Sequence, residues 1–157
     1  MRRIAWGCIV VTSMHGATVG LRCGVDMVDL GTFGRVLELG GHALVSTCFT
    51  PKERAQSKGH TASLAARWAA KEASAKMLGV GLMQGVGFTD IEVTLDRLGA
   101  PTLHLSGEAQ RLARRLKLAR WAVSLTHDGS HAVAFVVASV SESIDAERST
   151  GHDGADD

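Results

Sequence analysis

A carboxylate and an ammonium group four residues apart, Glu72 and Lys76, are the side chains of this sequence whose types and spacing favour chemistry. They lie in segment 61–78, which is rich in Ala, Leu, Lys and Glu and is followed by Gly79, so it is predicted to be a helix. On a helix, Trp68, Glu72 and Lys76 project in one line. Such a face can hold a divalent cation beside a phosphate. The spacing alone, however, favours a solvated ion pair worth about 0.3–0.5 kcal/mol.

Two further segments place an acid and an imidazole beside predicted strands. Asp26 falls inside the apolar run of a strand expected at about 19–27, where a carboxylate needs hydrogen bonds or a cation. The alternative is a turn or helix-capping aspartate, a role that suits Asp29 better. His127 ends a strand expected at 120–127, and Asp128-Gly129 predicts a hairpin to a second strand at 131–140. The continuous apolar run of that second strand indicates burial.

Six short motifs follow one another in a defined order between about Val19 and Val140. They are Gly24-Val25-Asp26, the stretch from Trp68 to Lys76, Gly79-Val80-Gly81, Asp90-Ile91-Glu92-Val93, Gly99-Ala100-Pro101, and the stretch from Ser124 to Asp128. On these motifs the chain resembles the holo-acyl-carrier-protein synthases, the small-type 4′-phosphopantetheinyl transferases. The resemblance implies an enzyme that moves phosphopantetheine from coenzyme A to a serine of an apo carrier protein and releases adenosine 3′,5′-bisphosphate.

The resemblance also implies a role for individual residues. Asp26 and Glu72 would hold Mg²⁺, an ion that prefers oxygen ligands. Glu72 would also take the proton of the incoming serine, and Lys76 would stabilise or protonate the phosphate oxygens. Coenzyme-binding roles are implied for a further set, namely Lys58, Arg67, Gly79, Gly81 and His127. Gly59 stands where the family is often basic, and His60 or Arg54 is a candidate to compensate.

Composition bounds the remaining classes of function. The 157 residues, 45% hydrophobic and 21% charged, are typical of one globular domain. Aromatic residues make up 4% and tyrosine is absent, which argues against a nucleic-acid reader that stacks bases. The three cysteines lack the spacing of metal ligands and favour a reduced, cytoplasmic setting. No apolar stretch approaches the ~20 residues of a membrane span.

The chain divides into three expected parts: an N-terminal extension over 1–17, a transferase domain over 18–140 and a disordered acidic tail over 141–157. The tail has a net charge of −5, which leaves +6 on residues 1–140 and suits an anionic coenzyme and an acidic partner. Helices are expected at 30–39, from Pro51 after a Thr50 cap, at 61–78 and at 107–118, with strands at 89–96 and 101–105. The expected class is α+β, an antiparallel sheet packed against a long helix. The resemblance implies a homotrimer.

The partner and the competing functions stay open at this point. Segment 30–39 has Arg35 as its only base, so an acyl, polyketide or peptidyl carrier is expected to dock by apolar contacts around Phe33, Val36 and Leu37. The alternative is that these three residues belong to the core. A catalytically silent homologue that binds coenzyme A or a carrier is the second candidate function. A nucleic-acid module that uses the basic face of segment 107–118 is the third.

Overall fold

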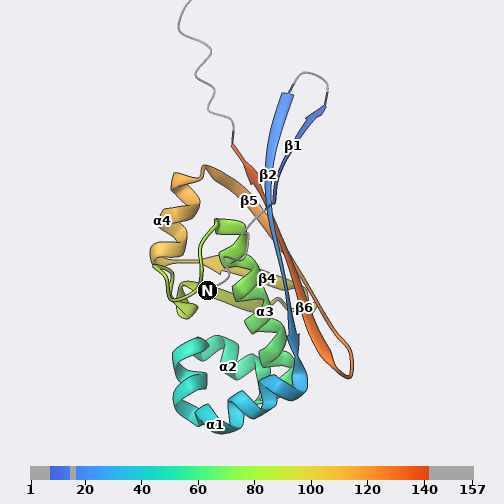
Figure 1. Ribbon diagram of the computed structural model, residues 1–157, viewed down its shortest axis with the longest axis vertical. Coiled ribbons are helices and arrows are strands. Elements are labelled where there is room, and N and C mark those ends of the chain that lie inside the picture. The colour runs from blue at the N-terminus through green and yellow to red at the C-terminus, as the bar shows by residue number, and fades with distance from the viewer. Residues whose placement is uncertain (1–7, 15–16, 142–157) are drawn as a thin grey trace, which may run out of the picture.

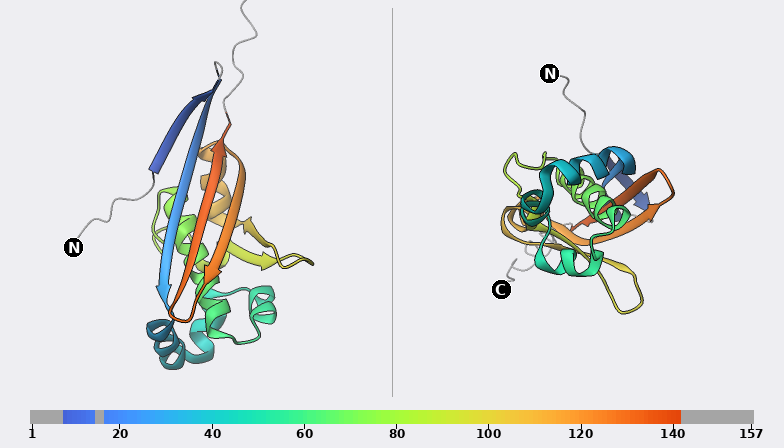
Figure 2. Two further views of the ribbon diagram at one scale, coloured as in Figure 1. Left: turned by 90° about the vertical axis from the view of Figure 1, so that its right-hand side faces the viewer. Right: turned by 90° about the horizontal axis from the view of Figure 1, so that it is seen from below.

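A four-stranded antiparallel sheet in the order β1-β2-β6-β5 runs along the protein (Figures 1 and 2). The computed structural model describes residues 8–14 and 17–141. The strands of this sheet are β1 (Cys8–Met14), β2 (Ala17–Asp29), β5 (Leu118–His127) and β6 (His131–Val140). A second sheet pairs β3 (Ile91–Leu95) with β4 (Pro101–Leu105), again antiparallel. The α+β class and the antiparallel sheet are therefore confirmed.

Helices lie on one side of the large sheet and at one of its ends (Figure 1). They are α1 (Leu30–Cys48), α2 (Pro51–Ser57), α3 (Thr61–Leu78) and α4 (Gly107–Arg115), with a 3-10 turn η1 (Phe88–Asp90) before β3. Asp29 caps α1, because its Oδ1 accepts the Thr32 amide at 2.7 Å. Thr50 and Glu53 form a capping box at the start of α2. Both caps agree with the sequence prediction.

Two helices differ in length from the prediction. The prediction ended the first helix at residue 39, and the helical backbone angles do break at Gly41, but a second helical segment that was not predicted extends α1 to Cys48. Gly41 has φ 53° and kinks the helix, and Leu44, Val45 and Cys48 then pack onto a core cluster below the sheet. In contrast, α4 ends at Arg115 and not at 118, because Lys117 takes up φ 54° and turns the chain into β5.

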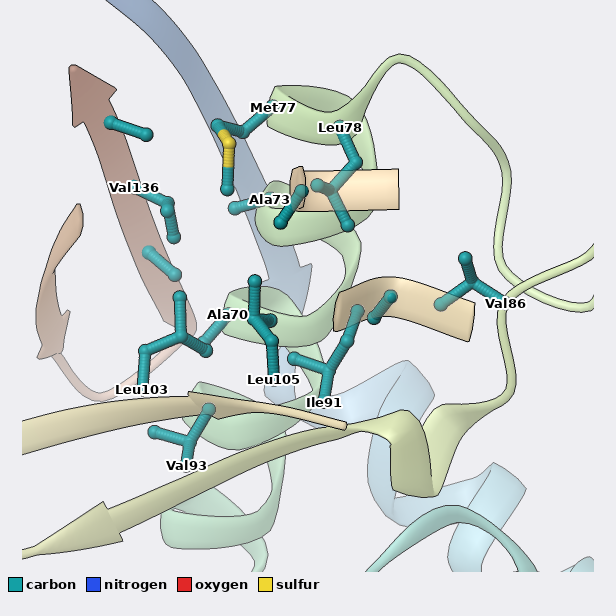
Figure 3. Close-up of a cluster of buried hydrophobic side chains, with 14 of the residues drawn as sticks. Ala70, Ala73, Met77, Leu78, Val86, Ile91, Val93, Leu103, Leu105 and Val136 are labelled. Atoms are coloured by element: carbon teal, nitrogen blue, oxygen red, sulfur yellow. The ribbon is translucent and has the colours of Figure 1, made fainter. Parts of the chain in front are cut away.

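Small residues bring α3 into backbone contact with the sheet. Ala69, Ala70 and Ala73 of α3 are fully buried, and alanines 134 and 138 of β6 face the same core. Gly24 of β2 is the tightest point, because a Cβ there would lie 2.0 Å from the carbonyl oxygen of Ala73. Around this contact, larger side chains from α3, β3, β4 and β6 fill the core (Figure 3). Strand β2 and helix α3 are thus fixed relative to each other.

The opposite face of the large sheet carries no helix of the described chain (Figure 2, left). The apolar run of β6 was expected to be buried, but burial alternates along it: alanines 132, 134 and 138 and Val136 are buried, whereas Phe135 is 45% exposed. Its register partner in β2, Val25, is 56% exposed, and Met27 is 63% exposed. Exposed apolar patches of this kind commonly mark an interaction surface.

The ends of the chain are described only in part. Strand β1 lies inside the expected extension 1–17 and pairs with β2 from Cys8↔Cys23 to Met14↔Ala17. Residues 1–7 and 15–16, and the acidic tail from residue 142, lie outside the described residues. Among the described helices, none has the length and hydropathy needed to cross a bilayer.

Candidate active site

Asp26 reaches the site from strand β2. It stands opposite Ala134 in the register with β6, so its side chain projects from the face that α3 covers. The carboxylate is 18% exposed, and its Oδ1 accepts a hydrogen bond from Lys76 Nζ at 2.8 Å. An aspartate inside an apolar strand needs a hydrogen bond or a cation, and Lys76 supplies both.

Trp68, Glu72 and Lys76 reach the site from α3. The indole of Trp68 lies in an aromatic cluster, with ring centroids 5.5 Å from Phe33 and 4.6 Å from Phe88. This packing fixes the rotation of the helix, since successive turns then present Glu72 and Lys76 toward β2. Asp26, Glu72 and Trp68 line one cleft of about 420 Å³, together with Asp29 and Thr32 from the start of α1. The structure therefore brings the two predicted metal ligands to a shared opening.

The environment of Glu72 favours its neutral form. Burial and, next, the negative charge of Asp26 raise the pKa of Glu72, and the ammonium of Lys76 acts in the opposite sense. Two carboxylates that face one cleft form a local excess of negative charge. A carboxyl group whose pKa is raised by a neighbouring acid is a frequent property of catalytic sites.

The donor set fits a hard divalent cation. Asp26 and Glu72 offer carboxylate oxygens from two rigid elements, and a cation between them would relieve the repulsion that raises the pKa of Glu72. Within the described residues no group of three or more His, Cys, Asp or Glu side chains is gathered in one place. Magnesium nevertheless fits two carboxylates, because it keeps several water ligands and completes its shell with substrate phosphates.

The residues expected to bind coenzyme A do not line this cleft within one chain. Lys58 is the left-handed C-cap of α2 and is exposed; Gly79 is the left-handed C-cap of α3, also exposed, and half-buried Gly81 follows it. His127 is exposed at the end of β5. Arg67 is 2% exposed, and its guanidinium donates to the Val93 carbonyl, Ser63 and Gln56. Arg67 thus supports the junction of α2, α3 and β3 in this chain, and its role toward a nucleotide stays a prediction.

A second hollow lies between α1, α2 and the start of α3. It measures about 370 Å³, and its lining includes Arg54, Ser57, Gly59 and Thr61. The Nε of Arg54 is buried and has no hydrogen-bond partner among the described residues. Arg54 thus has an unused donor near Gly59, and compensation for the missing base by Arg54 or His60 stays a prediction.

A buried ion pair between α2 and α3 was missed by the sequence interpretation. Lys71 Nζ lies 2.9 Å from Glu53 Oε2, and both side chains are 0% exposed. The ammonium also donates to the carbonyl oxygens of Phe88 and Ile91. The sequence signal was the inward stripe of α3, spaced three or four residues apart, which carries polar groups among apolar ones: Leu64, Arg67, Lys71, Ser74 and Leu78.

The expected docking residues of α1 separate into core and surface. Phe33 is 5% exposed and packs on Trp68, so it belongs to the core, and Leu37 packs against the same cluster. Val36 is 40% and Leu39 90% exposed. On α4, Arg111 and Arg115 pair with Glu108 on the helix surface, which agrees with a solvated face.

Comparisons with known proteins show the family of the chain. Residues 22–136 match the family model of the 4′-phosphopantetheinyl transferase superfamily. A holo-(acyl-carrier-protein) synthase of Geobacter sulfurreducens is 46% identical over 117 residues, which cover 73% of this chain and 93% of that protein. The synthase of Frankia alni is 43% identical over 122 residues, which cover 78% and 98%.

Solved structures show the same fold. The ACPS–CoA complex of Chronobacterium ammoniagenes superimposes with a TM-score of 0.69 at 32% identity and covers 78% of this chain and 98% of that one. The Helicobacter pylori holo-(acyl-carrier-protein) synthase in complex with coenzyme A gives a TM-score of 0.68 at 26% identity, covering 74% and 98%. The chain therefore belongs to the 4′-phosphopantetheinyl transferase superfamily and is an enzyme of the holo-(acyl-carrier-protein) synthase type.

Proposed function

We propose that the protein transfers 4′-phosphopantetheine from coenzyme A to a serine of an apo carrier protein, with Mg²⁺ as cofactor and adenosine 3′,5′-bisphosphate as the released product. The observation that carries this proposal is the convergence of Asp26 and Glu72, from β2 and α3, on one cleft. The alternative of a catalytically silent homologue is less favoured, because the acid pair and Lys76 are all present and assembled.

Each polar residue of the cleft has a task in this reaction. Asp26 and Glu72 would hold the magnesium ion, which supplies charge neutralisation of the coenzyme diphosphate when it is bound. Glu72, whose pKa is raised by burial and by Asp26, would accept the proton of the carrier serine as its oxygen attacks the diphosphate. Lys76 would donate to the phosphate oxygens or to the departing group. Trp68 and Phe33 shield one side of the cleft from water.

A homotrimer would complete the coenzyme site. Lys58, Gly79, Gly81 and His127 lie away from the cleft of their own chain, so a neighbouring copy would have to bring such residues to the coenzyme. The apolar outer face of the sheet, with Val25, Met27 and Phe135, offers a surface for this self-association. Lys58, Arg67 and Arg54 are the cationic candidates for the nucleotide phosphates.

The carrier is proposed to dock on α1 mainly by apolar contact. Arg35 is the one base over residues 30–39, whereas Val36 and Leu39 are exposed. An acyl, polyketide or peptidyl carrier with a partly apolar recognition helix would suit this surface.

Intact-mass spectrometry tests the function directly. The protein is incubated with coenzyme A, Mg²⁺ and apo carriers of the three kinds, and each carrier is weighed. A gain equal to one phosphopantetheine supports the proposal. If no carrier gains mass while coenzyme A still binds, the silent homologue is correct. Binding of nucleic acid without either result would favour the basic face of α4.

A further inference from the structure

Lys76 and the proposed divalent cation depend on the same carboxylate. The ammonium of Lys76 lies 2.8 Å from Asp26 Oδ1 and also donates to the Val25 carbonyl oxygen at 3.1 Å. Both acceptors belong to β2, and the lysine stands on α3, fifty residues further along the chain. The contact is therefore a tertiary one, which holds the Lys76 ammonium against β2.

This contact is partly shielded from water. The side chains of Lys76 and Asp26 are 25% and 18% exposed, so their interaction is stronger than that of a fully solvated pair. A divalent cation bound to Asp26 would meet the ammonium at close range, and two positive groups on one carboxylate repel each other. Because the lysine stem has four rotatable carbons, the ammonium can leave Asp26 without any movement of the backbone.

We propose that Lys76 is an exchangeable counter-ion, which neutralises Asp26 until a divalent cation takes that carboxylate and thereby frees the ammonium for the phosphates of coenzyme A. This inference rests on the proposed function, because it assumes the metal site at Asp26 and Glu72. Its consequence is a coupling between two ligands. The cation and the coenzyme both favour the Lys76 position in which the ammonium has left Asp26, so each should bind more tightly when the other is present.

The exchange predicts two results for Mn²⁺, a probe that electron paramagnetic resonance detects directly. Without coenzyme A, Lys76→Met should bind Mn²⁺ roughly threefold to tenfold more tightly than the unsubstituted protein, since the competing ammonium is gone. With coenzyme A present and no carrier, the gain in Mn²⁺ affinity that the coenzyme causes should be smaller in Lys76→Met. Lys76→Gln provides a second variant with a polar side chain, and circular dichroism verifies that both fold.

A matched control separates competition from simple loss of charge. Arg35 is an exposed cation on α1, the helix that borders the same cleft, and it donates to Thr32 Oγ1 without touching Asp26. Arg35→Met removes one positive charge and should change Mn²⁺ affinity by less than about twofold.

The outcomes distinguish the inference from the proposed function. If Lys76→Met and Lys76→Gln bind Mn²⁺ no more tightly than Arg35→Met, the exchange is wrong while the metal site stands. If the unsubstituted protein binds no Mn²⁺ with or without coenzyme A, the metal site itself is wrong, and the exchange fails with it.

Discussion

Replacing Lys71, the neighbour of Glu72 on α3, by methionine should strongly lower the free energy of unfolding of the protein. The Lys71 ammonium bonds to Glu53 and to the carbonyl oxygens of Phe88 and Ile91, so all its protons have acceptors. Burial lowers the pKa of Lys71, and the charge of Glu53 opposes that shift. The ammonium and the carboxylate thus contact each other in a place that water does not reach.

The expected loss of stability follows from the buried Glu53 carboxylate, which stays in place when Lys71 is removed. In Lys71→Met the Glu53 carboxylate still accepts the amides of Thr50 and Val93, at 2.8 Å and 2.9 Å, but it has no counter-charge. Removal of one partner from a buried pair typically destabilises by about 3–5 kcal/mol. A domain is stable by only about 5–15 kcal/mol, so the variant should lose a large share of its stability.

Urea unfolding at one fixed protein concentration, followed by tryptophan fluorescence and circular dichroism, measures this loss. The double variant Glu53→Gln, Lys71→Met is the control, because it also removes the stranded charge while keeping an acceptor near Val93. It should be more stable than Lys71→Met alone, which would be a clear departure from additivity. A loss below about 1 kcal/mol in Lys71→Met, or a double variant weaker than the single one, would refute the reasoning.

Three further predictions concern the site. Gly24→Ala should destabilise the protein by about 1–3 kcal/mol or more and weaken Mn²⁺ binding, since the new Cβ meets the Ala73 carbonyl oxygen. Thermal melts and Mn²⁺ titration measure the two effects. The control is Gly129→Ala, whose Cβ enters open space and should cause neither effect. Glu72→Gln should lower turnover by roughly 100-fold or more in the mass assay. It should also raise thermal stability at neutral pH. The folded pKa of Glu72 is raised above the ordinary 4.5, so its contribution is fully present below pH 4.5 and is lost as pH rises through the folded pKa. The advantage of glutamine should therefore vanish in melts at acidic pH. Modification of the carrier should change little between low and high salt, whereas a steep fall in rate would contradict apolar docking on α1.

Local sequence signals predicted local structure well. Helix α3 occupies the expected 61–78, and the caps at Asp29 and Thr50 are where the residue types placed them. The break in α1 at Gly41 lies where the sequence prediction ended the helix, but the second helical segment, which runs to Cys48, was not predicted. Its residues pack onto a core cluster, and such tertiary packing is not contained in any local pattern.

The residues of the candidate site could be predicted only where they lie in motifs shared with a known family. Spacing alone favoured an ion pair between Glu72 and Lys76, yet the ammonium lies on Asp26, fifty positions away. Only the resemblance brought Asp26 and Glu72 together before the structure did. The partnership of Lys71 with Glu53 escaped detection for a similar reason, since Glu53 already had a sufficient local role as a cap.

The missing side chain at Gly24 has a consequence for how this enzyme can change over evolutionary time. Where strand and helix meet main chain to main chain, their separation is set by peptide atoms that every sequence shares. Substitutions elsewhere in the interior can then alter bulk and stability without altering the gap between the two acids. Changes in core packing would therefore leave the relative position of Asp26 and Glu72 largely unaltered, as long as residue 24 stays glycine.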